Sequence, residues 1–405
     1  MSSALFMRVR PKIAMVVPDV TAGYGVCTVA DFLYRIIEDS RRYTPYIISL
    51  ATSFRDRYSV RLLSPHTWVT GYQVVQGIWH GKEYKHVGAI LTELEFQRYR
   101  PRRKLTHLLQ HFDLIQVVAG SPVWAYVTLP IQKPIALQVA TLLSAERQTL
   151  LAREKGLKRL WFRLMTKIGS YMEVSAINHV DAVFVENQWM YNHLCTMIPE
   201  SRVYFAPPGI DTDFFYPGTY QKNGYILSVG RFSDPRKNVR LLFDAYARIC
   251  RTVPSAPDLV LIGKAPSPAD MAYLTDLGVA DRVRIYTDVS QPTLAEFYRG
   301  ARLFVLSSDE EGLGLVILEA MASSLPVVST ACGGPSTSVL DGEAGFLTPI
   351  GDAVALSEAI KCLLLNPDLA RRMGEAGRQR VVKRFSLRVT GQAFLNVYDE
   401  LLGCK

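Results

Sequence analysis

The sequence predicts an α/β fold made of two doubly wound domains. Short apolar runs alternate with longer amphipathic segments throughout the 405 residues, which is the pattern of buried parallel strands joined by helices. A segment rich in proline and glycine, residues 206–213, separates this pattern into two halves. The length agrees with this division, because domains commonly hold about 150 residues. We therefore expect two parallel sheets, each covered by helices on both faces.

Each half contains six apolar runs that predict strands. In the first half they are Ile13–Val17, Pro45–Leu50, Leu114–Val118, Ile135–Val139, Ala182–Val185 and Val203–Phe205. In the second half they are Tyr225–Val229, Leu259–Ile262, Val283–Ile285, Phe304–Leu306, Val327–Ser329 and Gly345–Leu347. Residues 52–90 are irregular and give no prediction. The uncharged stretch 114–132 is interrupted by glycine and proline, so it predicts two buried strands and a loop rather than a membrane-spanning helix.

The composition indicates a folded chain in a reducing compartment. Hydrophobic residues make up 49% of the chain and charged residues 20%, which excludes a disordered protein. The six cysteines lie far apart with no CxxC pair, and this spacing fits neither a disulfide scaffold nor a zinc site. The first apolar run is too short for the core of a signal peptide. We therefore expect a cytoplasmic protein.

The net charge of +9 lies entirely in the first half of the chain. Residues 1–200 hold 24 Lys and Arg against 15 Asp and Glu, whereas residues 201–405 hold 22 of each kind. Within residues 153–168, apolar side chains recur at helical spacing with basic ones between them, which predicts a basic amphipathic helix. Such a helix either makes a peripheral contact with the inner face of an anionic membrane or turns its apolar stripe toward its own core. Nucleic acid is a weaker alternative and is not expected as a partner, because no nucleic-acid-binding motif accompanies the charge.

The second half carries a glycine-rich loop with two carboxylates. After the strand that ends at Leu306, the loop contains Gly312 and Gly314, and a helix follows. Glycines let the backbone approach a ligand closely, and the N-terminus of a helix stabilises an anion such as a diphosphate. Glu311 lies on the loop and Glu319 about one turn inside the helix, so they can reach opposite ends of an extended ligand. The alternative is an acidic loop before an ordinary amphipathic helix.

Two cations follow an earlier strand of the same half. Arg231 and Lys237 come just after Tyr225–Val229, at its carboxyl end. Two fixed cations facing one diphosphate would bind it and stabilise the charge that grows as a nucleoside diphosphate leaves. Taken alone, the two residues are weak evidence, because charge pairs of this kind are usually just solvated. A third glycine turn, Gly333-Gly334-Pro335, follows Val327–Ser329 and is predicted to lie beside the same pocket.

Together these motifs resemble the retaining glycosyltransferases of family 4, which have the GT-B fold. The similarity is carried by the Gly-Arg…Lys segment 230–237, the E-x7-E pattern within EGLGLVILEAMA, the Gly-Gly-Pro loop, the joint PPGIDTDFFYP and the terminal helix after Phe385-Ser386. The resemblance implies two Rossmann-like domains facing each other across a cleft. These are an acceptor-side domain 1–207 completed by the helix 386–405, a linker 208–217, and a donor-binding domain 218–385.

The resemblance also implies roles for individual residues. Arg231 and Lys237 would hold the donor diphosphate, Glu311 would contact the transferred sugar, and these three are the candidate catalytic residues. Glu319 would bind the ribose of the donor. The other candidates for donor binding are Gly312, Leu313, Gly314 and Leu315 through their backbone, Gly23 and Gly25 of the first domain, and Tyr286 with Lys264 near the base.

The implied activity is the transfer of a sugar from a nucleoside-diphosphate donor to a hydroxyl of a glycan or lipid-linked acceptor, with retention and without a metal or other cofactor. Asp211-Thr212-Asp213 spells a DxD sequence, but it lies in the linker and predicts a turn. The seven histidines show no spacing typical of metal ligands.

One position departs from the family pattern. Where many members have a histidine after the strand Ile135–Val139, this chain has Ala140. The nearby polar residues Thr141, Ser121 and Glu146 are the candidates on the acceptor side. Two alternatives stay open. Ala140 favours a catalytically impaired partner subunit that binds a sugar nucleotide. The other alternative is a nucleotide-sugar epimerase of the same shape, and the lack of a histidine counts against it because an epimerase needs acid and base side chains around the sugar ring.

Overall fold

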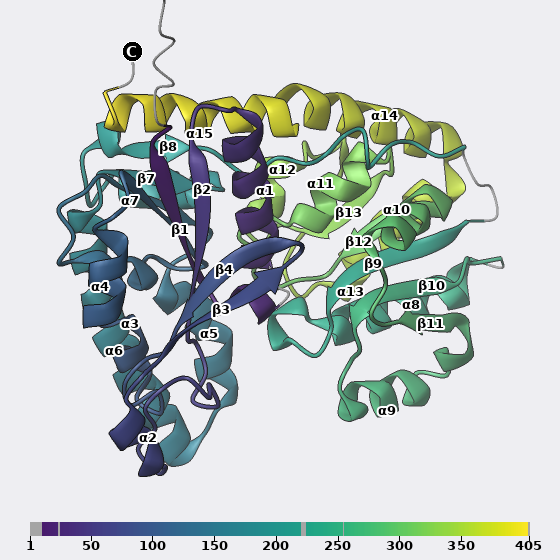
Figure 1. Cartoon of the computed structure of the whole chain (residues 1–405). Coiled ribbons are helices and arrows are strands. Elements are labelled where there is room, and N and C mark those ends of the chain that lie inside the picture. The colour runs from purple at the N-terminus through teal and green to yellow at the C-terminus, as the bar shows by residue number, and fades with distance from the viewer. Residues whose placement is uncertain (1–9, 23–24, 220–223, 254, 404–405) are drawn as a thin grey trace, which may run out of the picture. The chain divides into compact units, whose positions relative to one another are not determined.

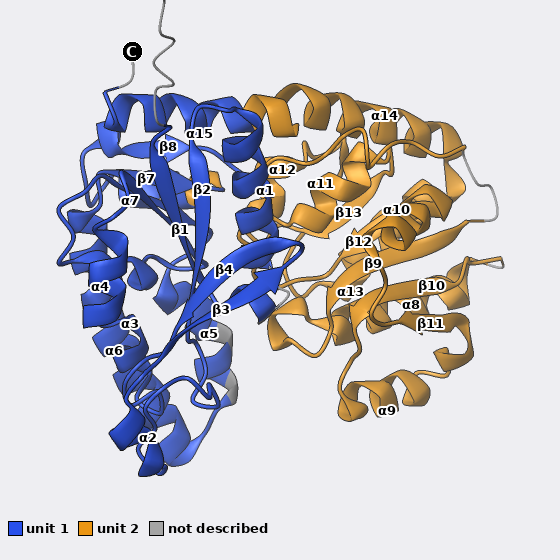
Figure 2. Cartoon of the chain, viewed as in Figure 1, with its two compact units in different colours: residues 1–186, 190–208, 391–405 blue, residues 187–189, 209–390 orange. Residues whose placement is uncertain are grey.

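The structure, a computed structural model, describes residues 10–22, 25–219, 224–253 and 255–403 (Figure 1). The contacts divide the chain into two units (Figure 2). Unit 1 comprises residues 1–186, 190–208 and 391–405, and unit 2 comprises residues 187–189 and 209–390.

Unit 1 is built on an eight-stranded sheet with the order β3-β4-β2-β1-β5-β6-β7-β8. The predicted strands are present, because continuous apolar runs are buried on both faces of a covered parallel sheet. The strands are β1 (Lys12–Pro18), β2 (Thr44–Leu50), β3 (Val74–Trp79), β4 (Lys82–Val87), β5 (Leu114–Val118), β6 (Ile135–Val139), β7 (Ala182–Val185) and β8 (Val203–Phe205).

The hairpin β3–β4 departs from the expectation of a wholly parallel sheet. These two strands pair antiparallel, while β4 continues the sheet by pairing parallel with β2. Both lie in the stretch 52–90 that gave no prediction. Their residues alternate between exposed and partly buried positions, so they lack the continuous apolar run that marks the inner strands.

Helices cover the sheet of unit 1. One face packs against a core that includes Val117, Leu137 and Val183. On the other face Phe184 of β7 lies 4.3 Å from Phe394, centroid to centroid, and the Tyr398 hydroxyl donates to Gln116 of β5 at 2.7 Å. The helices of unit 1 are α1 (Gly25–Asp39), α2 (His66–Thr70), α3 (Glu95–Tyr99), α4 (Arg103–Leu109), α5 (Leu143–Arg153), α6 (Gly156–His179), and the greater parts of α7 (Gln188–Leu194) and α15 (Leu387–Leu401).

The stretch 114–132 contains one strand and a helix, so the prediction of two strands there is wrong. After β5, residues Pro122–Thr128 form a 3-10 helix that begins with proline. Its buried residues include Pro122, Val123, Ala125 and Val127. The Thr128 hydroxyl is also buried and donates to the carbonyl of Ala125. Burial therefore produced an apolar run without a strand. Within the described residues, no helix is both long enough and apolar enough to cross a membrane.

Unit 2 is built on a six-stranded, wholly parallel sheet with the order β11-β10-β9-β12-β13-β14. All six strands coincide with the predicted runs, extended by one to three residues. They are β9 (Tyr225–Arg231), β10 (Leu259–Lys264), β11 (Val283–Tyr286), β12 (Ala301–Leu306), β13 (Val327–Thr330) and β14 (Gly345–Thr348).

The sheet of unit 2 has an apolar core on each face. Its helices are α8 (Val239–Thr252), α9 (Pro268–Asp276), α10 (Gln291–Gly300), α11 (Leu315–Ala322), α12 (Gly334–Ser338), α13 (Ala353–Leu365) and α14 (Pro367–Arg384). Because the sheet is parallel, the loops after β10, β9, β12 and β13 leave it at one edge, which we call the carboxyl edge of unit 2. Ligands of doubly wound sheets bind outside such an edge.

Candidate functional site

The loop after β9 is shaped by its own side chains. Asp234 accepts the backbone N–H of Arg236 at 3.1 Å and caps a 3-10 turn, Pro235–Lys237. Asn238 then has a positive φ of 41°, and its side chain accepts the N–H of Leu241 to cap α8. Asn suits this position because it tolerates the left-handed conformation better than most residues and its side-chain oxygen is among the preferred N-cap acceptors. Lys237 therefore lies between Asp234 and Asn238, two residues whose side chains fix the backbone on either side of it.

Lys237 forms an ion pair with Glu311 of the loop after β12. The Lys237 ammonium donates to Oε1 of Glu311, and the Ser308 hydroxyl donates to the same oxygen at 2.7 Å. Both side chains are mostly buried, with 16% of Lys237 and 12% of Glu311 exposed. Partial burial strengthens such a charge-assisted bond. One cation and one carboxylate of the predicted set are therefore in direct contact.

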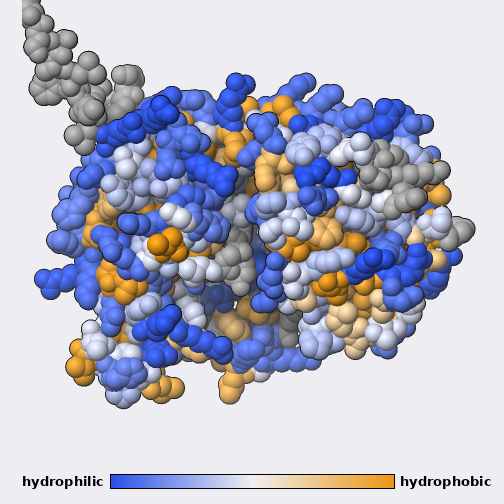
Figure 3. Space-filling view, turned by 45° about the vertical axis from the view of Figure 1, so that its right-hand side comes forward, coloured by the Kyte–Doolittle hydropathy of each residue, from blue (hydrophilic) through white to orange (hydrophobic). Residues whose placement is uncertain are grey.

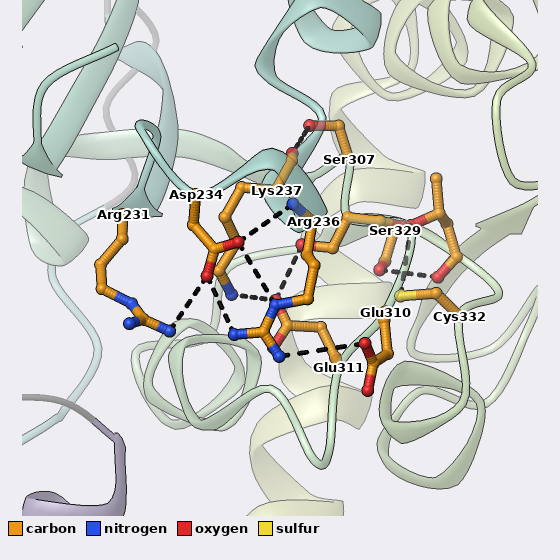
Figure 4. Close-up of polar contacts among 11 residues, drawn as sticks. Arg231, Asp234, Arg236, Lys237, Ser307, Glu310, Glu311, Ser329 and Cys332 are labelled. Carbon is orange, nitrogen blue, oxygen red and sulfur yellow. Dashed lines mark hydrogen bonds and ion pairs between the residues drawn. The ribbon is translucent and has the colours of Figure 1, made fainter. Parts of the chain in front are cut away.

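A second group of charges surrounds Asp234 (Figure 4). Its carboxylate accepts Arg236 at 2.9 Å and pairs with Arg231 at 3.2 Å, and Arg236 lies 3.9 Å from Glu310. Burial opposes ionisation of Asp234, but the hydrogen bonds and charge of Arg236, with the charge of Arg231, lower its pKa. Arg231 is thus held by a carboxylate that the sequence analysis did not single out.

Backbone and amide contacts join the two loops. The Asn238 side chain donates to Asp309 at 2.8 Å, and the Asp309 N–H donates to the Arg236 carbonyl at 2.7 Å. The Ser307 hydroxyl donates to the Lys237 carbonyl at 3.0 Å. The loop after β12 therefore has a fixed position relative to the loop after β9.

The glycines on this edge have distinct structural uses. Gly314 has a φ of 77° and is the N-cap residue of α11. The first N–H groups of α11, which have no acceptor within the helix, therefore lie next to this loop. Gly334 donates its N–H to the Glu311 carbonyl at 3.0 Å, and a Cβ at Gly334 would lie 2.5 Å from the Cα of Leu313. The Gly-Gly-Pro turn therefore packs directly against the loop that carries Glu311.

Glu319 lies inside unit 2, one turn into α11 as predicted from its spacing. It is 7% exposed, and its carboxylate accepts the Tyr298 hydroxyl at 2.7 Å. Burial raises the pKa of Glu319 to about 7, although the bond from Tyr298 acts in the opposite direction. Burial also raises the pKa of the Cys332 thiol to about 12, so this cysteine stays neutral.

The remaining donor candidates are placed as follows. Lys264 ends β10 in register with Arg231 of β9, and Tyr286 ends β11 with its ring 4.9 Å from that of Phe297. Leu313 is buried at 2% exposure. The carbonyl of Gly312 accepts the side-chain amide of Asn187 at 2.6 Å, a contact that no sequence motif indicated.

The donor-binding roles of the two glycines of the first domain stay predictions. Gly23 lies outside the described residues. Gly25 is the first residue of α1 in unit 1, and a Cβ there would meet no atom within 4 Å.

The DxD sequence forms a turn, as predicted. Oδ1 of Asp211 accepts the backbone N–H groups of Asp213 at 3.1 Å and Phe214 at 3.0 Å. Among the described residues, no three His, Cys, Asp or Glu side chains are grouped in a way that could hold a metal ion.

The carboxyl edge of unit 2 thus presents cations, glycine-shaped backbone and a helix N-terminus, and a sequence comparison identifies this part of the chain. Residues 209–380 match the family model described as glycosyl transferases group 1. Residues 209–380 belong to the glycosyl transferases group 1 family. All four residues of the predicted charged set, Arg231, Lys237, Glu311 and Glu319, lie within this group 1 segment.

Two curated relatives of the chain are glycosyltransferases by name. The chain is 37% identical over 183 residues to the lipopolysaccharide core biosynthesis glycosyltransferase LpsE of Rhizobium meliloti, covering 44% of this chain and 50% of that protein. It is 27% identical over 292 residues to the MMP alpha-(1->4)-mannosyltransferase of Mycolicibacterium hassiacum, covering 71% and 68%. The match to LpsE therefore spans about half the length of that relative.

Solved structures extend the likeness to the whole fold. Sucrose-phosphate synthase from Thermosynechococcus elongatus superimposes with a TM-score of 0.77 at 21% identity, over 98% of this chain and 100% of that one. Alr3699/HepE of Anabaena, in complex with UDP-glucose, gives a TM-score of 0.69 at 17% identity, over 96% and 100%. At these identities the likeness shows the fold, and it confirms the predicted GT-B class.

Proposed function

We propose that this protein is a retaining glycosyltransferase that moves a sugar from a nucleoside-diphosphate donor to a hydroxyl acceptor without a metal ion. The observation that carries the proposal is the cluster of Arg231, Lys237 and Glu311 on two joined loops beside the N-terminus of α11. This cluster fits a ligand that is anionic at one end and rich in hydroxyls at the other. Both features belong to a sugar nucleotide.

The leaving group explains why cations are needed. In the transfer, the bond between the anomeric carbon and the phosphate oxygen breaks, and a bond forms from that carbon to the acceptor oxygen. The acceptor proton passes to the departing phosphate oxygen, so no separate protein base is required. Negative charge grows on the diphosphate as the bond breaks, and preorganised cations and helix N–H groups stabilise it. Arg231, Lys237 and the N-terminus of α11 would supply that stabilisation.

The carboxylates would orient the sugar and the ribose. An ionised carboxylate accepts hydrogen bonds at both oxygens, so it suits vicinal hydroxyls. Glu311, held by Lys237 and Ser308, would bind the transferred sugar next to the diphosphate. Glu319 would bind the ribose, with its second partner Tyr298 fixing the carboxylate. Lys264 and Tyr286, at the ends of β10 and β11, would lie nearest the base.

We assign the acceptor to unit 1, because the charged side chains suited to the donor belong to unit 2. The relative LpsE is named for lipopolysaccharide core biosynthesis, which favours a glycan joined to a lipid as the acceptor class. The Ala140 position is compatible with this chemistry, because the leaving phosphate takes the proton that a histidine would otherwise receive.

The test is a panel of nucleoside-diphosphate sugars incubated with the purified protein, with and without EDTA. Release of one nucleoside diphosphate should depend on the acceptor and be unchanged by EDTA, and the product should keep the anomeric configuration of the donor in its NMR spectrum. An inverted product or a strict need for a divalent metal would contradict the mechanism. Isomerisation of the donor without transfer would instead favour an epimerase.

A further inference from the structure

The first turns of α6 expose apolar side chains to solvent. Leu157 is 86% exposed, Leu160 63%, Trp161 42% and Leu164 49%. Scattered exposed apolar residues are normal on a protein surface, and on the face drawn in Figure 3 they form small groups among hydrophilic residues. These four differ because they follow one another at steps of three and one along a single helix. Together they form a stripe.

This stripe is not the side of α6 that packs on unit 1. The packed side is formed by residues that begin where the stripe ends, namely Met165, Gly169, Met172, Ala176 and Ile177, all of which are buried. At 3.6 residues per turn, these positions share one face, and the stripe lies about a third of a turn around the helix from it. The alternative that the apolar stripe faces its own core is therefore wrong for Leu157, Leu160, Trp161 and Leu164.

A row of cations runs beside the stripe. Arg159, Arg163 and Lys167 are exposed and stand four residues apart, so their side chains leave the same side of the helix. The neighbouring Lys158 is not counted in the row, because it pairs with Glu154 at 2.6 Å. We call the seven residues of the stripe and the row the α6 face: Leu157, Arg159, Leu160, Trp161, Arg163, Leu164 and Lys167.

We propose that the α6 face binds the surface of an anionic lipid bilayer. Charge complementarity favours that occupant. Long basic side chains meet lipid phosphates while leucine and tryptophan enter the boundary between head groups and acyl chains. A second copy of this chain fits poorly, because it would bring two cationic rows together. The whole positive excess of +9 also lies in residues 1–200, the half of the chain that holds α6.

The proposal is independent of the proposed function, because it concerns residues outside the candidate donor site. It predicts binding that depends on anionic lipid and weakens with salt. Dissolved ions screen the attraction between exposed charges that are more than about 8 Å apart at physiological ionic strength, and this distance shrinks as salt is added. It also predicts that Trp161 enters a less polar environment on binding.

The experiment measures sedimentation of the full chain with vesicles of phosphatidylcholine alone or with about 30% phosphatidylglycerol. Each mixture is measured at about 0.05 M and about 0.5 M salt, where electrostatic screening is weak and strong respectively. Three variants are compared with the natural chain: Arg159→Glu/Arg163→Glu, Leu160→Ser/Leu164→Ser, and a control, Arg372→Glu/Lys383→Glu, on exposed positions of α14. The control makes the same change of charge in unit 2. Thermal unfolding and circular dichroism report whether each variant is folded.

We expect the natural chain and the control to bind anionic vesicles at low salt and to lose most binding at high salt. Both α6 variants should bind at least tenfold more weakly, with unchanged unfolding temperature. The blue shift of tryptophan fluorescence on binding should disappear in Trp161→Phe.

The proposal is overturned if the natural chain does not bind anionic vesicles at low salt, or if the α6 variants bind as well as the control. A natural dimer that the α6 variants convert to monomers would likewise overturn it, because the face would then be an interface between copies. None of these outcomes depends on whether the sugar-transfer test succeeds.

Discussion

Lys237 and Glu311 are joined by a direct ion pair although 74 residues separate them in the sequence. The pair links the loop after β9 with the loop after β12 at the carboxyl edge of unit 2. An ammonium group has three N–H donors, so Lys237 can bind a phosphate oxygen while it stays paired with Glu311. We expect the two residues to act as one unit in donor binding.

The first prediction separates binding from folding at this pair. Lys237→Met should weaken binding of the preferred nucleoside diphosphate at least tenfold, because a charge-assisted contact is lost. It should also lower the free energy of unfolding by about 1–3 kcal/mol, because Glu311 is left mostly buried and without its cation. The double variant Lys237→Met/Glu311→Gln should regain the stability and not the binding. Calorimetric titration and thermal unfolding measure the two effects, and restored binding in the double variant would contradict the role of Lys237.

A second prediction concerns Asp234, which holds both Arg231 and Arg236. Asp234→Asn keeps the shape of the side chain but removes the charge that positions these two guanidinium groups. Binding of the nucleoside diphosphate should weaken about threefold to tenfold, because Arg231 and Arg236 remain present and the expected loss is about that of one ordinary hydrogen bond. The matched control is Asp270→Asn, which breaks the ion pair between Arg240 of α8 and Asp270 of α9. Equal or tighter binding in Asp234→Asn would show that Asp234 competes with the ligand instead of positioning Arg231.

The third prediction is a pH dependence caused by Glu319. Burial raises its pKa from 4.5 to about 7, so the folded state favours the protonated form. The stability gained from that form is fully present below pH 4.5 and is lost as the pH rises to about 7. The amide side chain of the variant Glu319→Gln cannot ionise. The free energy of unfolding of Glu319→Gln, relative to that of the natural chain, should therefore increase by up to about 3 kcal/mol between pH 4.5 and about pH 7.

The comparison must be made against the natural chain, because burial also raises the pKa of Glu173 and Glu186 to about 7. Those carboxyl groups lie in unit 1 and contribute the same trend to both proteins. Urea unfolding at several pH values measures the difference. Parallel stability curves for the natural chain and Glu319→Gln would contradict the pKa of Glu319.

The fourth prediction tests the packing of the Gly-Gly-Pro turn. Gly334→Ala would place a Cβ 2.5 Å from the Cα of Leu313 and 2.6 Å from the Gly312 carbonyl oxygen. Backbone atoms cannot yield cheaply, so we expect a loss of about 1–3 kcal/mol in stability and weaker donor binding. Gly120→Ala is the control, because a Cβ there meets nothing within 4 Å. Thermal unfolding should shift for the first variant only; an unshifted Gly334→Ala would mean that the turn does not constrain the Glu311 loop.

The inner strands were predictable because a strand that is buried on both faces of a sheet needs apolar residues at successive positions. The hairpin β3–β4 was missed because a half-exposed strand has alternating polar residues, and residues 122–128 were misjudged because a buried 3-10 helix is as apolar as a strand. Periodicity alone does not separate short buried elements of different kinds.

The candidate site was predictable only in part for a different reason. Glycines, cations and carboxylates placed after strands point to one edge of a parallel sheet, so the set around Lys237 and Glu311 could be listed from sequence. The capping roles of Asp234 and Asn238 follow a local signal, a short polar residue before a helical turn, which the sequence analysis did not use. The contact with Asp309 could not be predicted, because it depends on which partner the folded loops bring near. The Asn238–Asp309 bond joins residues 71 positions apart, and no spacing rule indicates it.

The central claim is that the carboxyl edge of unit 2 binds the diphosphate of a sugar nucleotide. A crystal structure with the tightest-binding nucleoside diphosphate tests it most directly. We predict phosphate oxygens within hydrogen-bond distance of Lys237 Nζ and the Arg231 guanidinium, with the ribose hydroxyls at Glu319. A nucleotide bound elsewhere, with Lys237, Arg231 and Glu319 untouched, would contradict the claim.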